Sequence, residues 1–407
     1  MQNSTKSHNK LREGFSTGSA VSAGAAAAVR LLLTGTAQCE VSIAPPPFTG
    51  SGASLSPDNP VRLGIPVAYA QILKDSVKVA IIKDGGDDPD ATNRMLIEVY
   101  AARHEDAFTH LPGTWLELEA GLRIKCGPGV GTVTLPGLPA RPGEPAINPH
   151  PRKQIFFAVY EELSRLGLAP ACLPEFPVCL YLRIPRGAER AKNTLNSRLG
   201  ILGGVSILGT RGTVRPFSHE AWQATISQGL DIAHSLGIAD ICFSTGRRSE
   251  LGLQKLYPDL PEQAFIQAAD FAKYSVTSAA QRKFGKIIWG CYCGKLLKLA
   301  QGLPYTHARS ARADLPLLAE WAGNCGAPAD ICGQIAALPT AQGAFDLLEA
   351  HSPAISAELL KKVAKTAMAT LTAWLAGTKT SLCLHVLRPD NTPWLQLEDK
   401  TGSNEIF

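Results

Sequence analysis

The sequence predicts an α/β protein of two domains, on the basis of three observations. Its 407 residues are enough for roughly two to three domains of ordinary size. Between residues 39 and 133, short apolar runs alternate with Gly/Pro turns, which is typical of a sheet-rich α+β unit. After Asn196, helical segments alternate with hydrophobic strands, which indicates βαβ units and a Rossmann-like parallel sheet. We therefore expect an α+β domain over 11–195, a Rossmann-like α/β domain over 196–390, and flexible tails at 1–10 and 398–407.

The first predicted domain opens with a helix and continues with strands. A Ser/Thr/Gly turn over 11–19 can cap an alanine-rich helix that runs from Ala20 to Leu33 and ends at Gly35. Such a helix start can also hold an anion, but the turn alone favours ordinary capping. Strands are expected at 61–67, 76–82, 95–101, 115–118 and 130–135. A proline-dense connection over 136–151 then leads to a helix at 153–166 and a strand at 179–184.

The second predicted domain alternates helices with strands. Helices are expected at 219–236, 262–273, 295–300 and 355–375. Strands are expected at 238–244, 286–290 and 381–386, with a polar tail at the end of the chain. We find no internal repeat and no low-complexity tract.

Composition excludes several classes of protein. Hydrophobic residues make up 45% and charged residues 18%, which excludes a disordered or collagen-like chain. The ten cysteines contain no C-x-x-C pair, so we expect no metal site, and thiols kept reduced in the cytoplasm. The alanine-rich run contains Arg30 and follows Glu13, which favours an internal helix over a signal peptide. No uncharged run is long enough to predict a transmembrane helix.

An acidic loop follows the strand expected at 76–82. The segment KDGGDDPD, residues 83–90, places Asp84, Asp87, Asp88 and Asp90 within seven residues, and two glycines bend the chain. The spacing of these acids is not that of an EF-hand, so it gives only weak support for a calcium site. Like charges packed so closely cost stability, and this favours a ligand-binding role over a solvated turn. Carboxylates of this kind can accept hydrogen bonds from ribose hydroxyls or lie near a cationic ligand.

Basic residues gather later in the first predicted domain and just beyond it. Residues 183–215 hold seven Arg and Lys side chains against the single acid Glu189, whereas the whole chain has a net charge of only +5. Arginine forks suit carboxylates and phosphates, so this patch favours a polycarboxylate, a nucleotide or a nucleic acid, while a solvated basic face explains the charge equally well. The proline-stiffened segment before it presents Asn148, His150, Arg152 and Lys153 at a helix start, which is typical of a binding element.

Glycines and polar residues mark three further candidate segments. Five glycines over 200–212 do not fit the G-x-G-x-x-G spacing, so they do not predict a dinucleotide site, but they let backbone approach a ligand closely. The segment FSTGRRSE, 243–250, follows a predicted strand, at the edge where open α/β sheets bind ligands. Gly290, Gly294 and Lys295 resemble a Walker A loop, but the loop is too short and Leu296 replaces its Ser or Thr, which excludes an NTPase.

Eight of these segments, taken in order, closely resemble the CbiD family of cobalt-precorrin-5B C(1)-methyltransferases. They are FSTGS, KDGGDDPDAT, VTLPGL, GEPAINPHPRK, NTLNSRLGILGGVSILGTRGTVRP, STGRRSE, GKLLKLAQG and YTH. The resemblance spans roughly residues 11 to 320 and is most specific in the fourth and fifth segments. It implies that S-adenosylmethionine methylates ring carbon 1 of cobalt-precorrin-5B, giving cobalt-precorrin-6A in anaerobic cobalamin biosynthesis.

The resemblance also implies roles for individual residues. The carboxylate-rimmed corrinoid substrate would be bound by Asn148, Arg152, Lys153, Arg198 and Arg211. The methyl donor would be bound by Asp84, Asp87, Gly203, Gly204, Ser206, Thr245 and Gly246. His307 and Asp88 are the candidate catalytic residues. Cobalt belongs to the substrate, so the protein itself needs no metal ligands.

Two departures and two alternatives accompany this interpretation. Family members often have His near the position of Tyr292, and THARSARAD, 306–314, differs from the usual family pattern. A corrinoid-binding protein without transferase activity is one alternative. The other is a nucleic-acid-binding protein using the basic patch 183–215, although that patch contains no aromatic residue to stack on bases. We expect a cytoplasmic enzyme that binds neither nucleic acid nor membrane, and the sequence leaves a homo-oligomer open.

Overall fold

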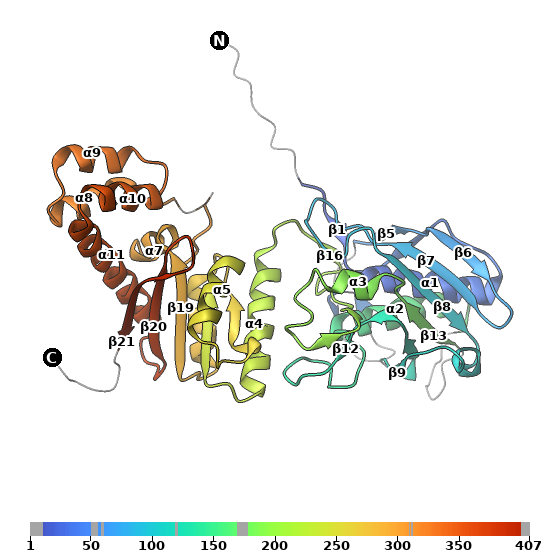
Figure 1. The fold of residues 1–407 in the computed structure, drawn as a ribbon. Coiled ribbons are helices and arrows are strands. Elements are labelled where there is room, and N and C mark those ends of the chain that lie inside the picture. The colour runs from blue at the N-terminus through green and yellow to red at the C-terminus, as the bar shows by residue number, and fades with distance from the viewer. Residues whose placement is uncertain are drawn as a thin grey trace, which may run out of the picture. The chain divides into compact units, whose positions relative to one another are not determined.

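The chain forms two compact units, seen in a computed structural model that describes residues 11–49, 56–57, 61–118, 121–168, 178–308, 310 and 312–399 (Figure 1). Unit 1 is Met1–Ser218 and unit 2 is His219–Phe407. Both units combine helices with sheets, so the expectation of a mixed α/β chain is confirmed. The expected tail at 1–10 and residues 400–407 of the other tail lie outside the described residues.

A six-stranded mixed sheet is the centre of unit 1. Only β10 and β13 pair in parallel, and the other neighbours are antiparallel. The strand order is β6 (Tyr69–Ile72), β7 (Val77–Ile82), β8 (Leu96–Ala102), β13 (Cys179–Arg183), β10 (Arg123–Cys126), β9 (Thr114–Glu117). A short 3₁₀ helix, η2 (Glu105–Phe108), follows β8.

One helix packs directly on this sheet and forms the core of unit 1. Helix α1 (Thr17–Thr34) packs against β7, β8 and α2 (Pro149–Arg165). Its small side chains allow a close approach, since a Cβ at Gly24 would lie 2.7 Å from Val99 Cγ2. Gly35 ends the helix in the left-handed conformation, with φ of +69°, as its sequence position predicts. Among the described helices α1 alone is long and apolar enough to span a membrane, but 78% of that window is buried inside the structure, as in a core helix.

Short strand pairs attach the remaining loops of unit 1. They are β1 (Gly14–Phe15) with β16 (Thr213–Val214), β2 (Glu40–Ile43) with β5 (Leu63–Pro66), β3 (Phe48–Thr49) with β4 (Ser56–Pro57), β11 (Gly129–Val130) with β15 (Gly204–Val205), and β12 (Thr132–Val133) with β14 (Ile201–Leu202). The five-residue helix α3 (Gly187–Ala191) lies beside β11 and β15.

These pairs place the division of the chain later than the sequence analysis does. Residues 196–218 were expected to open the second domain, yet their strands β14, β15 and β16 all pair with strands of unit 1. The change in sequence pattern after Asn196 marks the start of a glycine-rich segment whose strands pair with those of unit 1. The structure therefore divides after Ser218 and not after Leu195.

A five-stranded sheet is the centre of unit 2. Its order is β18 (Phe265–Gln267), β17 (Asp240–Ser244), β19 (Lys286–Tyr292), β20 (Ser381–Leu387), β21 (Pro393–Asp399). The first four strands are parallel and β21 is antiparallel to β20. Alternate residues face opposite ways, so Ile287 and Trp289 enter the large core while Ile288 packs with Cys242 and Cys383 on the other face.

Helices cover both faces of this sheet. Helix α5 (Arg247–Leu256) packs on β17, β18 and β19, and its Leu253 joins Ile288. The large core on the opposite face receives side chains from α4 (His219–Ser235), α6 (Ala272–Gln281), α7 (Cys293–Ala300) and α11 (Pro353–Trp374). Helices α8 (Leu315–Asn324) and α10 (Ala341–His351) pack beside α11, and α9 (Ala329–Ala337) packs against α8 and α10.

Two sequence-based expectations in unit 2 are wrong. The segment 262–273 is not a helix but a short 3₁₀ turn, η4 (Glu262–Ala264), followed by strand β18. Its apolar residues mimic a helical face, but backbone pairing with β17 decides the conformation. The tail expected from residue 398 begins inside β21, because Glu398 and Asp399 pair with Cys383 and Leu382.

Candidate functional site

The acidic loop of unit 1 forms ion pairs within the chain. The Asp84 carboxylate accepts two hydrogen bonds from the Arg12 guanidinium, which lowers the pKa of that carboxyl. Asp90 pairs with the Lys83 ammonium, whose side chain is only 2% exposed. Burial alone would raise the pKa of Asp90, but the charge and hydrogen bond of Lys83 hold it below its usual value. These two acids therefore fix the loop, and Asp84 already has a cationic partner.

The other two acids of the loop bind backbone amides. The Asp87 carboxylate accepts from Arg12 N at 2.6 Å, and the Asp88 carboxylate accepts from Phe217 N at 3.0 Å. Asp87 is exposed and Asp88 is half-buried. Each carboxylate retains lone pairs beyond these bonds, so both can accept further hydrogen bonds. The structure thus brings the loop beside residues 12–15 and 213–217, which the sequence alone did not connect.

Two glycines, Gly204 of the glycine-rich segment and Gly187 before it, pack directly against the backbone of Gly129. A Cβ at Gly204 would lie 2.2 Å from Gly129 O, and a Cβ at Gly187 would lie 2.1 Å from the same oxygen. Gly203 differs, because its φ is +77° and nothing lies within 4 Å of the Cβ position. Close approach to a ligand is therefore available at Gly203, whereas Gly204 is needed for packing.

Ser206 and the start of α1 are also engaged within unit 1. The Ser206 hydroxyl donates to Asn196 Oδ1 at 3.3 Å, and Asn196 Nδ2 donates to Gly204 O at 3.0 Å. At the helix start, Gly18 N donates to Leu208 O and Ser19 N donates to the capping Ser16 Oγ. Capping, which the sequence favoured over anion binding, is confirmed at these amides.

The start of α2 presents the residues expected to bind the substrate. Asn148 occupies the N-cap position but makes no side-chain capping bond, so its amide is available. Arg152 donates to Ile147 O at 2.8 Å and to Glu144 Oε2 at 2.7 Å, which commits part of its guanidinium to the loop. Lys153 is half-buried, and its ammonium has no partner among the described residues. Lys153 is therefore the better-placed cation for an anionic ligand.

The basic stretch is partly neutralised within the fold. Ion pairs join Arg183 to Glu98, Arg186 to Glu189 and Arg215 to Glu13. Arg198 is half-buried and Arg211 is exposed, and each has an interaction partner of its own. The patch is consequently less basic than its sequence suggests.

In unit 2, Thr245 and Gly246 lie at the carboxyl end of β17. The Ser249 hydroxyl donates to Gly246 O at 3.0 Å and accepts from Thr245 N at 3.2 Å, which holds the turn into α5. Nothing lies within 4 Å of the Cβ position of Gly246. The fully buried Glu250 accepts from Gln267 Nε2 at 2.9 Å and thereby connects α5 to the end of β18. The sequence-predicted pair thus lies at the carboxyl edge of a parallel sheet, where open α/β sheets generally bind ligands, and the position of Gly246 is open.

A polar cluster next to this edge holds the segment that contains His307. The Lys295 ammonium pairs with Asp270 and donates to Thr306 O at 3.0 Å. Lys298 also donates to Thr306 O, at 2.9 Å, and burial together with Lys295 lowers its pKa. The His307 ring stacks on Tyr305 with centroids 6.1 Å apart. In the sequence, Lys295 was notable only as part of an incomplete Walker A pattern. In the structure it anchors the loop that carries His307.

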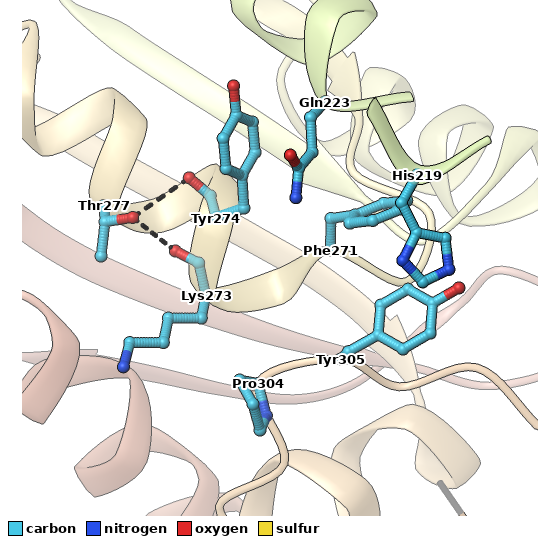
Figure 2. A pocket seen from close by; sticks show the side chains of 8 residues that line it. All are labelled: His219, Gln223, Phe271, Lys273, Tyr274, Thr277, Pro304 and Tyr305. Atoms are coloured by element: carbon cyan, nitrogen blue, oxygen red, sulfur yellow. Dashed lines mark hydrogen bonds between the residues drawn. The ribbon is translucent and has the colours of Figure 1, made fainter. Parts of the chain in front are cut away.

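A pocket of about 470 Å³ lies in unit 2 and was missed by the sequence analysis (Figure 2). It lies between the starts of α4 and α6 and the loop after α7. Its walls include His219, Gln223, Phe271, Lys273, Tyr274 and Tyr305. Only Tyr305 belongs to a segment singled out in the sequence, because residues from three separated segments meet here by folding alone.

The residues expected to bind the donor are divided between the units. Asp84, Asp87, Gly203, Gly204 and Ser206 belong to unit 1, whereas Thr245 and Gly246 belong to unit 2. Of the candidate catalytic residues, Asp88 belongs to unit 1 and His307 to unit 2. Among the described residues, no group of three or more His, Cys, Asp or Glu side chains is arranged to hold a metal ion.

Comparison with known proteins finds similarity to CbiD family models and to proteins named cobalt-precorrin-5B C(1)-methyltransferase. The CbiD family model matches residues 4–216, and the model of the CbiD C-terminal domain matches residues 305–391. A cobalt-precorrin-5B C(1)-methyltransferase of Nitratidesulfovibrio vulgaris is 48% identical over 338 residues, covering 83% of this chain and 81% of that protein. One from Geobacillus sp. is 37% identical over 339 residues, covering 83% of this chain and 84% of that protein.

One solved structure is also similar. It is the crystal structure of the cobalamin biosynthesis protein cbiD from Archaeoglobus fulgidus, with 24% identity, a TM-score of 0.34, and coverage of 70% of this chain and 78% of that one. The family model over residues 4–216 and the relative at 48% identity decide the assignment: this chain belongs to the CbiD family.

Proposed function

We propose that this chain transfers a methyl group from S-adenosylmethionine to ring carbon 1 of cobalt-precorrin-5B, giving cobalt-precorrin-6A in cobalamin biosynthesis. The observation that carries the proposal is the 48% identity, over 83% of the chain, to a protein named for the C(1)-methylation. A sulfonium is the donor that this chemistry calls for, because its positively charged sulfur is a good leaving group.

The bond changes in this reaction are simple. The carbon–carbon bond forms from the electron pair of ring carbon 1, and the carbon–sulfur bond of the donor breaks with its pair remaining on sulfur. S-adenosylhomocysteine is the second product. Such a displacement needs the attacking carbon, the methyl group and sulfur in line, so the main task of the protein is to hold two ligands in that geometry.

The substrate site in this proposal is the start of α2 with the basic residues of unit 1. A corrinoid carries acetate and propionate groups on its rim, and carboxylates pair with ammonium and guanidinium groups. The Lys153 ammonium, which has no partner in the described part of the chain, and the Asn148 amide would bind these carboxylates, with Arg152 held in place by Glu144. Arg198 and Arg211 would add positive charge beside them.

The donor site in this proposal is the carboxyl edge of the unit 2 sheet, used as a Rossmann-like fold uses it. Thr245 and the open Gly246 would line the donor there. In unit 1, the exposed Asp87 binds one backbone amide and keeps lone pairs for a ligand, whereas Asp84 is paired with the Arg12 guanidinium. The open Gly203 is likewise better placed than Gly204, which packs on Gly129, and Ser206, which binds Asn196. His307 and Asp88 remain the candidates for proton handling, and the displacement itself needs no strong acid.

A methyl-transfer assay tests the proposal. The purified chain is incubated with cobalt-precorrin-5B and S-adenosylmethionine carrying an isotopic label in its methyl group, and the corrinoid is analysed by mass spectrometry. The proposal predicts one labelled methyl group on the corrinoid and one equivalent of S-adenosylhomocysteine. A folded protein that binds the corrinoid without any transfer would instead support the alternative of a corrinoid-binding protein.

Variants of unit 1 test the substrate site. Lys153→Ala should raise the KM for the corrinoid about tenfold with little change in kcat, because it removes one charge-assisted contact. Lys74→Ala is the matched control, since Lys74 is an exposed lysine of the same unit, in the turn between β6 and β7 and outside the basic patch. Equal effects of the two substitutions would contradict the assignment of Lys153.

A further inference from the structure

The pocket of unit 2 has the size and lining of a small-molecule site. Its volume of about 470 Å³ lies within the usual range for ligand pockets. Three aromatic rings form one side of it: the centroids are 4.7 Å apart for His219 and Tyr305, 5.3 Å for His219 and Phe271, and 5.0 Å for Phe271 and Tyr305. Phe271 is buried, whereas His219 and Tyr305 are more accessible, so the latter two can offer a ring face to a ligand.

Polar groups without partners complete the lining. The Gln223 amide lies one helical turn beyond His219 on α4, and Figure 2 shows it pointing toward the cavity between Tyr274 and Phe271. Among the described residues, the Gln223 amide, the Tyr274 hydroxyl and the Lys273 ammonium make no hydrogen bond or ion pair. An amide that can both donate and accept is suited to the edge of a nitrogen heterocycle.

Hydrogen bonds hold the walls of the pocket together. Lys273 N donates to Pro304 O at 3.2 Å, and Thr306 N donates to Asp270 O at 2.9 Å. The Lys295 ammonium joins the same two segments from the side, through Asp270 and Thr306. Phe271 and Tyr305 are thus fixed on both sides by backbone pairing, and a preformed site binds its ligand with less loss of entropy.

We propose that this pocket binds the adenine of the methyl donor. The inference rests on the proposed function and assigns to the donor a site beyond the β17 edge. The base would stack on Tyr305 and His219, Gln223 would hydrogen-bond its edge, and Lys273 at the rim would attract the donor carboxylate. The corrinoid fits this pocket poorly, because its rim carries many carboxylates and Lys273 is the single lysine or arginine among the lining residues.

Calorimetric titration with adenosine, S-adenosylhomocysteine and methionine tests the site. These ligands are titrated into the full chain, with and without cobalt-precorrin-5B. Adenosine should bind and should compete with S-adenosylhomocysteine, whereas methionine alone should compete weakly. Tyr305→Leu, which keeps apolar volume but removes the ring, should weaken adenosine and S-adenosylhomocysteine binding about tenfold. Gln223→Ala should weaken both by a smaller factor.

Matched controls come from the same helix. Gln228→Ala and Trp222→Ala change another glutamine and an exposed tryptophan of α4, neither of which lines the pocket, and both should leave the dissociation constants unchanged. Circular dichroism and thermal melting establish that each variant is folded. Unchanged adenosine affinity in folded Tyr305→Leu and Gln223→Ala proteins would overturn the inference.

The assay separates this inference from the proposed function. If the wild-type chain methylates the corrinoid and the pocket variants keep the wild-type KM for the donor, the pocket assignment is wrong and the function stands. If the wild-type chain binds adenosine but transfers no methyl group, and the pocket variants lose adenosine binding, the pocket assignment stands and the proposed function is wrong. If both are correct, Tyr305→Leu raises the donor KM and changes kcat less.

Discussion

At the scale of single residues, the buried pair of Lys83 and Asp90 lies at the base of the acidic loop. Lys83 is only 2% exposed, and Asp90 also accepts from Thr92 N at 2.7 Å. Asp90→Asn would leave a buried ammonium without its counter-charge. We expect a loss of about 3 kcal/mol in the free energy of unfolding, measured by urea denaturation.

The double variant is the control for this pair. Replacing Lys83 by Met as well removes the unpaired charge, so the Lys83→Met, Asp90→Asn protein should regain much of the lost stability. An Asp90→Asn protein as stable as the wild type would show that the pair contributes nothing.

A second buried residue predicts a dependence of stability on pH. His385 is 3% exposed, its Nε2 lies 2.7 Å from the Tyr257 hydroxyl, and its Nδ1 has no hydrogen-bond partner among the residues that the structure describes. Burial, with Lys286 nearby, lowers the pKa of His385 from 6.5 to about 4. Between these two pH values the imidazole is protonated in the unfolded chain but neutral in the folded chain. The free energy of unfolding therefore falls as the pH drops from 6.5 toward 4.

This contribution amounts to about 3 kcal/mol at most. His385→Gln should unfold with a weaker pH dependence than the wild type across that window, as followed by urea melts of both proteins. His351→Gln is the control, because His351 is exposed in the same unit. Identical pH slopes in the wild type and His385→Gln would contradict the assignment.

At the scale of elements, neighbouring glycines of the 200–212 segment should differ sharply. A Cβ at Gly204 would lie 2.2 Å from the backbone oxygen of Gly129, so β11 and β15 would have to separate. We expect Gly204→Ala to cost about 3 kcal/mol or more in the free energy of unfolding. At Gly203 the Cβ meets nothing and only the positive φ is strained, so Gly203→Ala should cost about 1 kcal/mol.

Denaturant unfolding of the two variants measures this difference. Equal losses of unfolding free energy in Gly204→Ala and Gly203→Ala would mean that the close contact between β11 and β15 does not restrict the side chain at position 204. The same variant tests the proposed donor contact of Gly203: Gly203→Ala should stay folded and should raise the KM for S-adenosylmethionine in the methyl-transfer assay.

At the scale of the whole molecule, the boundary after Ser218 can be tested with fragments. Residues 196–218 supply β14, β15 and β16 to unit 1, and Leu208 exchanges hydrogen bonds with Thr17 at the start of α1. A fragment of residues 11–218 should therefore fold, with dispersed amide resonances and a cooperative thermal transition. A fragment ending at residue 195 should not, because three strand pairs and the contact with α1 are missing.

Much of the fold was predictable because its signals are local. The alanine-rich helix, the strands at 76–82 and 95–101 and the strands of the parallel sheet have clear periodicity and turn residues at their ends. The segment 262–273 was not predictable in this way, since a three-residue edge strand carries too little pattern of its own. Helices α8, α9 and α10 and strand β21 were also not anticipated. The three helices pack against one another and α8 and α10 also against α11, while β21 pairs with β20, so these elements depend on distant neighbours.

The candidate site was predictable in part. Sequence motifs located the acidic loop, the start of α2, the Thr245–Gly246 turn and the segment of His307, and the ordered motifs identified the family. They gave no sign that Asp84 pairs with Arg12, because these partners are 72 residues apart and meet only through the tertiary structure. Lys83 and Asp90 belong to one loop, but the sequence did not show which of its four carboxylates the lysine would meet. The aromatic pocket was invisible for the same reason.

The sequence by itself determined the family, the mixed α/β class and the chemical character of the segments proposed to bind ligands, because motifs and periodicity are carried by neighbouring residues. The tertiary structure decided which of those groups are available to a ligand. Glycines, carboxylates and arginines are equally able to serve packing or binding, and only the positions of their neighbours in space settle which. Gly204 packs against the backbone of Gly129, and Asp84 is paired with Arg12. Gly203, Lys153 and the ring of Tyr305 remain accessible to a ligand.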